Sequence, residues 1–108
     1  MFNIITKRTI NDYGKQYPEA ENALRKWYHD IKNAKFENMN DLKTVYKNAS
    51  IIADNRVVFK IHGNSYRLVV RVNFFYKAIM IKWFGTHKEY DEIDVETVIF
   101  KKNGSKNN

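Results

Sequence analysis

The first half of the chain is patterned for helices. After Pro18, which suits the first turn of a helix, apolar residues recur every three to four positions, the spacing of one helix face. The residues on that face are Leu24, Trp27, Tyr28 and Ile31. Before this helix we expect a strand over residues 2–5 and a helix over residues 6–16, with Thr6 as its N-cap.

A shorter apolar stripe follows at the same spacing. Leu42, Val45 and Tyr46 form this stripe and predict a helix over residues 41–46. Asn40 or Asp41 would cap its first turn, because their side-chain oxygens accept from free backbone N–H groups.

From Arg56 the apolar period changes to two, which predicts β-strands. We expect strands over residues 56–61, 65–74 and 78–84, with Gly63 and Asn64 taking positive φ angles in the first connecting turn. These strands form an antiparallel meander. The fold class is therefore α+β, with two or three helices packed on one face of a twisted, mainly antiparallel sheet.

Strand alternation gives this sheet one apolar and one basic face. The apolar face, expected to meet the helices, carries Val57, Phe59, Ile61, Tyr66, Leu68, Val70, Val72, Phe74, Ile79, Ile81 and Trp83. The basic face carries Arg56, Lys60, Arg67, Arg71 and Lys82, with Phe84 placed to stack on a base. A solvated sheet face can be polar without function, but it ordinarily mixes charges of both signs. We therefore expect this face to bind a polyanion.

Composition supports one domain and an anionic partner. With 108 residues and 44% hydrophobic content, there is material for one core, so we expect a single domain over residues 1–100 and a flexible basic tail over residues 101–108. The net charge is +7, and residues 56–88 contain seven basic and no acidic side chains. The chain has no cysteine, no signal-peptide pattern and no apolar run long enough for a membrane span, so we expect a cytoplasmic protein with no membrane partner.

The segment GTHKEYD, residues 85–91, places His87 and Tyr90 at the end of the last strand. A lone histidine there is commonly a surface residue, but RNA cleavage needs a proton acceptor, a proton donor and cations, which this edge supplies. The positive field would lower the pKa of the Tyr90 phenol, or the ring would stack on a base. The three histidines lie on separate predicted elements, so we expect no metal site and no cofactor.

Two longer segments resemble a known toxin family. VVFKIHGNSYRLVVRV and KWFGTHKEYD are similar to the HigB branch of the RelE/ParE toxin superfamily, and the likeness runs from IIT near the N-terminus to EYDEID. The resemblance implies a RelE-like fold and a metal-independent mRNA interferase. Such an enzyme enters the ribosomal A site, uses the 2′-hydroxyl of the mRNA as nucleophile and leaves a 2′,3′-cyclic phosphate. It also implies a HigA-like helix-turn-helix antitoxin, through which alone the toxin reaches operator DNA.

The resemblance also assigns roles to residues. The catalytic residues it implies are Arg67, Arg71, His87 and Tyr90. The residues expected to bind RNA are Arg56, Lys60, Asn64, Lys82 and Lys88. The chain departs from the family at Lys82, where arginine is expected, and after Asp94, where we expect Thr97 to Phe100 to add an edge strand or dock on a partner.

Two other functions remain compatible with this sequence. A ParE-like toxin would keep the fold and inhibit a protein target such as DNA gyrase, without using His87. A basic RNA-binding or ribosome-associated domain would use the same charged face without chemistry. Fold does not decide among these functions.

Overall fold

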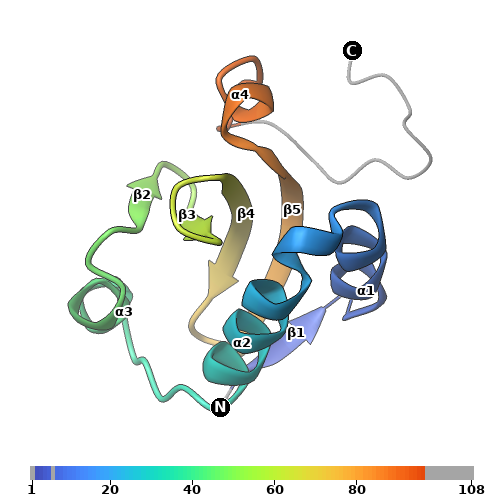
Figure 1. Cartoon of the computed structure of the whole chain (residues 1–108). Helices are drawn as coiled ribbons and strands as arrows, with labels where there is room; N and C mark the ends of the chain where they lie inside the picture. Colours follow the sequence, from blue (N-terminus) through green and yellow to red (C-terminus); the bar gives the residue numbers. More distant parts are fainter. Residues whose placement is uncertain (1, 6, 97–108) are drawn as a thin grey trace.

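Figure 1 shows a computed structural model of the chain, which describes residues 2–5 and 7–96. Its elements are β1 (Asn3–Ile5), α1 (Lys7–Gln16), the 3₁₀ turn η1 (Pro18–Ala20), α2 (Glu21–Lys32), α3 (Met39–Val45), β2 (Ser50–Ile52), β3 (Arg56–Ile61), β4 (Tyr66–Asn73), β5 (Ala78–Thr86) and α4 (His87–Tyr90). The strands form one sheet in the order β1-β5-β4-β3-β2, in which only β1 and β5 pair in parallel. The predicted α+β class and antiparallel meander are confirmed. None of the helices in these residues is long and apolar enough to cross a membrane.

Helices α1 and α2 lie together on one side of the sheet, as Figure 1 shows. The predicted stripe on α2 is confirmed, since Leu24, Trp27 and Ile31 are all buried in the core. Pro18 does not begin this helix but the 3₁₀ turn before it, where its missing N–H needs no partner.

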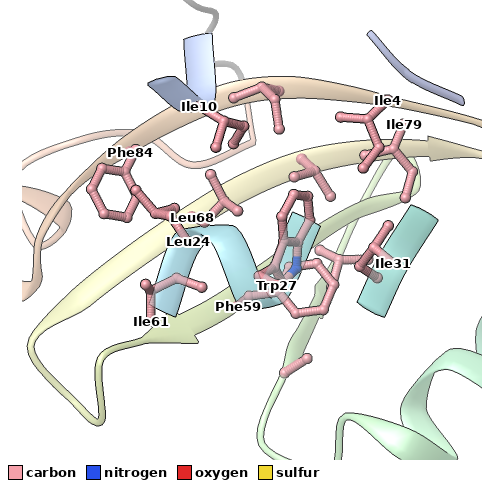
Figure 2. Close-up of a cluster of buried hydrophobic side chains, with 14 of the residues drawn as sticks. Ile4, Ile10, Leu24, Trp27, Ile31, Phe59, Ile61, Leu68, Ile79 and Phe84 are labelled. Carbon is pink, nitrogen blue, oxygen red and sulfur yellow. The ribbon is translucent and has the colours of Figure 1, made fainter. Parts of the chain in front are cut away.

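The core lies between these helices and the apolar sheet face. Figure 2 shows Trp27 of α2 beside Phe59 of β3, with ring centroids 5.5 Å apart. Leu68 and Ile79 of the neighbouring strands are fully buried. Burying each such side chain contributes about 1.5–3 kcal/mol of stability. Burial of this apolar face against the helices therefore fixes the opposite face of the sheet on the side away from α1 and α2.

A β-bulge in β5 reverses part of the predicted face assignment. Val69 pairs with Trp83 and Val70 with Ile81, so Lys82 is an extra residue in β5. Beyond the bulge the alternation shifts by one: Phe84 joins the core, and Trp83 packs with Val69 on the opposite face. The expectation that Phe84 stacks on a base is therefore wrong, because that side chain is only 5% exposed.

The other local differences concern helix α3 and the turns. Helix α3 is capped by Asn38, whose side chain accepts from the backbone N–H of Asp41, in place of the predicted Asn40 or Asp41. Val45 was expected to face the core but is 64% exposed. In the β3–β4 turn, positive φ angles occur at His62 and Gly63, and Asn64 is not among these residues.

Some expectations fall outside the described residues, and the sequence patterns predicted neither β2 nor the short helix α4. The N-cap at Thr6, the segment Thr97 to Phe100 and the tail over residues 101–108 are not described. Strand β2 has three residues and pairs with the first half of β3, and α4 is a single four-residue turn after β5.

Candidate functional site

Arg67 occupies the end of the sheet at which α4 begins. Its cross-strand neighbours are Lys60 on β3 and Gly85 on β5, and α4 follows two residues after Gly85. The backbone N–H of His87 donates to the carbonyl oxygen of Ser65 at 2.9 Å, which ties the start of α4 to the start of β4. The fold thus brings Arg67, His87 and Tyr90 to one end of the sheet.

The Arg67 guanidinium is oriented by neutral acceptors. Nη1 donates to the carbonyl oxygens of Asn64 and Tyr66, both at 3.1 Å, and Nη2 donates to Oδ1 of Asn64 at 2.8 Å. Arg67 is only 7% exposed, and no carboxylate of the described residues forms an ion pair with it. A buried cation without a carboxylate partner is well suited to stabilise an anion that approaches it.

Helix α4 holds His87 close to a carboxylate. Thr86 and Glu89 form a capping box, which fixes the first turn of this four-residue helix. One turn later, Asp91 places Oδ2 at 3.4 Å from Nδ1 of His87. A carboxylate on one ring nitrogen orients an imidazole and leaves the other nitrogen available to exchange a proton.

Tyr90 remains a neutral phenol in this environment. Burial raises the pKa of Tyr90, the nearby Arg67 charge lowers it, and Asp91 raises it further. The net direction is upward, so the expectation that the positive field acidifies this phenol is wrong. Its ring lies beside Trp83, with the two centroids 6.2 Å apart.

Gly85 is required by close packing around this site. A Cβ atom at this position would lie 2.6 Å from Cη2 of Trp83 and 2.7 Å from Oε1 of Glu89. Glu89 is also held by Tyr17, which lies between α1 and η1, because the Tyr17 hydroxyl donates to the same oxygen at 3.1 Å. The absence of a side chain at Gly85 therefore lets Trp83 cover the strand and Glu89 cap α4 at once.

Replacing Gly85 with alanine should lower the free energy of unfolding by about 1–3 kcal/mol, because the Trp83 ring or the Glu89 carboxylate must move. Urea unfolding followed by far-ultraviolet circular dichroism measures this change. Gly14→Ala is the matched control, since a Cβ there meets only the flexible Glu21 side chain, at 3.1 Å, inside helix α1. Equal losses for the two variants would contradict the packing role of Gly85.

The basic residues at the other end of the sheet form a separate group. Arg71 pairs across the strands with Arg56 and Met80, four residues from Arg67, a distance of about 13 Å along a strand. Arg71 does not stand uncompensated as expected: its Nη2 lies 3.1 Å from Oδ1 of Asp54, and its Nε donates to the Asp54 carbonyl oxygen. The structure therefore does not bring Arg71 to His87.

Arg56 and Lys82 belong to this second group. Arg56 was expected on an open face but is only 5% exposed, and its Nη1 donates to the carbonyl oxygen of Val95 at 3.1 Å. Partial burial and the charges of Arg56 and Arg71 lower the pKa of Lys82, and Asp54 opposes that shift. Lys82 thus lies in the field of the other cations, as the basic-face pattern predicts.

Three of the predicted RNA-binding residues surround the Arg67 end. Lys60 is exposed beside Arg67 on β3, and Lys88 is exposed on α4. Asn64 lies in the hairpin turn and accepts two of the hydrogen bonds that orient Arg67. Asn64 therefore helps to position the Arg67 guanidinium.

Sequence reasoning overlooked Trp83 and Asp91 as members of this site. Only the bulge brings Trp83 to this face, and strand alternation contains no signal for it. Asp91 follows His87 at the i, i+4 spacing of a helix face, a signal that becomes readable once GTHKEYD is recognised as a capped helix start. Among the described residues, no three His, Asp or Glu side chains gather in a way that could hold a metal ion.

Comparisons with known proteins identify the family. The family model for HigB toxins, described as the RelE-like toxic component of a toxin-antitoxin system, matches residues 20–93. The mRNA interferase HigB of Escherichia coli O6:H1 is 27% identical over 93 residues, which cover 84% of this chain and 90% of the relative. The mRNA interferase toxin HigB of Escherichia coli K12 and the mRNA interferase HigB of Shigella flexneri are each 30% identical over 91 residues, 82% of this chain and 88% of theirs. The chain therefore belongs to the HigB family of toxins, the RelE-like toxic components of toxin-antitoxin systems.

Proposed function

We propose that this toxin is an endoribonuclease that cleaves mRNA during translation. The observation that carries the proposal is the Arg67 end of the sheet, where a buried guanidinium, which no carboxylate of residues 2–5 and 7–96 pairs with, lies at the same end as His87 and the neutral Tyr90. These groups provide a cation for the phosphate and two side chains for proton transfer. The names of the relatives, mRNA interferases, support the same activity.

Their environments favour different roles for His87 and Tyr90. In this reaction His87, whose Nδ1 lies 3.4 Å from Oδ2 of Asp91, uses its other nitrogen, Nε2, as the base that removes the 2′-hydroxyl proton. The freed oxygen attacks the adjacent phosphorus, and the bond to the 5′-oxygen breaks. Tyr90, whose pKa is raised, keeps its proton at neutral pH and donates it to that leaving oxygen. The products are a 2′,3′-cyclic phosphate and a 5′-hydroxyl end.

Arg67 stabilises the charge that develops on the phosphate during this step. The remaining residues bind the RNA backbone: the cations Lys60 and Lys88 and the neutral amide of Asn64 near Arg67, and the cations Lys82, Arg71 and Arg56 at the far end of the face. Because about 13 Å separates Arg67 from Arg71, the two arginines contact different phosphates. Arg71 exchanges the Asp54 carboxylate for a phosphate when RNA binds.

The setting of this reaction follows the family. We propose that the toxin acts in the ribosomal A site, that its antitoxin is a HigA-like helix-turn-helix protein, and that operator DNA is bound only through the toxin–antitoxin complex. The proposal places the protein in the cytoplasm, where mRNA is translated.

Expression of the toxin without its antitoxin tests the function. We expect growth arrest together with new RNA ends in translated messages, each cut leaving a 2′,3′-cyclic phosphate and a 5′-hydroxyl. Sequencing of 5′-hydroxyl RNA ends measures this, and blocking initiation should suppress the cuts. Growth arrest with intact messages would reject the nuclease and favour a toxin that inhibits a protein target.

A further inference from the structure

A cleft of about 610 Å³ opens between α2, the segment that joins α3 to β2, and the β3–β4 hairpin. Its lining mixes polar and charged residues with apolar ones, and the apolar residues are Ala23, Trp27, Val45, Tyr46, Ala49, Phe59 and Ile61. Val45 is 64% exposed on this wall, although a valine at this position would gain from burial. The proposed RNA chemistry does not use this apolar wall.

One side of the cleft is an open sheet edge. Strand β2 pairs only with Arg56, Val57 and Val58, so β3 extends three residues beyond it. Within the described part of the chain, no strand lies on that side of Phe59–Ile61. The backbone of such an edge is a template for an extended peptide, which adds a strand by main-chain hydrogen bonds.

The charges around the cleft favour an acidic occupant. Lys26 is compensated by Asp30, with Nζ and Oδ2 2.6 Å apart. Lys47 and Lys60 also line the cleft, and neither forms an ion pair with a carboxylate of the described residues. A peptide with acidic and apolar side chains matches these features better than RNA, because apolar walls and a strand edge offer little to phosphates.

The wall formed by the α3–β2 segment is held in place without a partner. The Lys43 ammonium donates to the carbonyl oxygens of Lys47, at 2.7 Å, and Ala49. The Tyr46 ring packs edge-to-face on Phe59, with the ring centroids 5.0 Å apart. A preformed wall lowers the ordering cost of binding, so a short segment can dock with useful affinity.

We propose that this cleft binds an acidic, extended segment of the partner antitoxin, which adds a strand to the open edge of β3. A toxin of this family has an antitoxin partner, so the inference does not depend on RNA cleavage. Asn64, which orients the Arg67 guanidinium, also lines the cleft. A segment bound there contacts Lys60 and Asn64, two residues that are also proposed to bind RNA. Docking of the antitoxin segment therefore competes with RNA binding at the edge of the basic face.

Titration calorimetry with the cognate antitoxin tests the cleft, using full-length toxin that carries His87→Ala to limit toxicity. Val45→Glu should weaken binding about tenfold or more, and Lys47→Glu should weaken it in a salt-dependent way. The matched controls are Phe75→Glu, at an 85% exposed position in the β4–β5 turn, and Lys15→Glu, in the last turn of α1. We expect these controls to change the dissociation constant by less than about twofold.

Hydrogen exchange on the same complex tests the strand addition. Antitoxin binding should slow exchange of the backbone amides in Phe59–Ile61. The indole N–H of Trp27, which is buried without a hydrogen-bond partner among the described residues, should shift in the NMR spectrum, with Trp27→Phe assigning its signal. Protection confined to other segments would overturn the proposal.

A cellular assay separates this inference from the proposed nuclease. With His87 intact, Val45→Glu should still arrest growth, and co-expressed antitoxin should no longer relieve the arrest, whereas Phe75→Glu should be neutralised normally. If Val45→Glu and Phe75→Glu bind the antitoxin equally but Val45→Glu binds ribosomes more weakly, the cleft is a ribosome contact and the proposal is wrong.

Discussion

Replacing His87 with alanine should slow RNA cleavage by about a hundredfold to ten-thousandfold and leave the fold intact. The side chain is 45% exposed and lies beside the Asp91 carboxylate at the surface, so its removal creates no buried cavity. The expected loss comes from the missing base for the 2′-hydroxyl proton. Single-turnover cleavage of a message in a translation reaction measures the rate, and thermal unfolding checks the fold.

His29→Ala is the matched control, because His29 is an exposed histidine on α2, away from the α4 end of the sheet. It should leave the cleavage rate unchanged. If His87→Ala keeps full toxicity, the proton-transfer role is wrong. The protein would then act as a binding toxin on a target such as DNA gyrase.

Replacing Arg67 with lysine should lower kcat by about a hundredfold to a thousandfold. Lysine keeps the positive charge but cannot donate to the Asn64 and Tyr66 oxygens and to a phosphate with the fixed geometry of a guanidinium. Because Arg67 is buried, the free energy of unfolding must be measured alongside, by urea denaturation. A loss of activity larger than the loss of folded protein would assign the effect to chemistry.

Arg71→Lys is the informative comparison. Arg71 lies about 13 Å from Arg67 and is paired with Asp54 on a partly exposed surface, so the substitution should raise KM and leave kcat nearly unchanged. Its effect should also shrink as salt rises, as expected of a backbone contact. Equal losses of kcat for the two variants would show that both arginines contact the reacting phosphate.

This contrast follows from how the structure divides the basic face. One end carries a guanidinium held by neutral acceptors beside His87 and Tyr90, and the other end carries Arg56, Arg71 and Lys82 around Asp54. The two groups have different electrostatic environments, and we infer different roles for them: chemistry at the first and RNA retention at the second.

Much of the fold could be predicted because local spacing determines it. The period-two segment after Arg56 predicted strands that match β3 and nearly match β4 and β5. The α2 stripe predicted which helix residues are buried. Likewise, the segment GTHKEYD indicated that a histidine and a tyrosine lie at the mouth of a strand. In each case the signal lies within a few neighbouring residues.

The face assignment failed at one point for a physical reason. Successive side chains alternate between the two faces of the sheet only while the hydrogen-bond ladder between β4 and β5 is regular. The extra residue Lys82 in β5 interrupts that ladder. Packing favours this irregularity, since Phe84 then fills the core beside Tyr13 and Tyr66. No pattern within the strand distinguishes a bulged AIMIKWF from a regular one.

The sequence was thus sufficient to predict the class of fold, the order of the central strands and the protein family, and with the family the candidate site residues. Only the folded chain could decide which cations have partners: Asp54 reaches Arg71 from 17 positions away, and the Val95 carbonyl reaches Arg56 from 39. Such contacts depend on how distant segments meet in three dimensions, and local periodicity does not encode them.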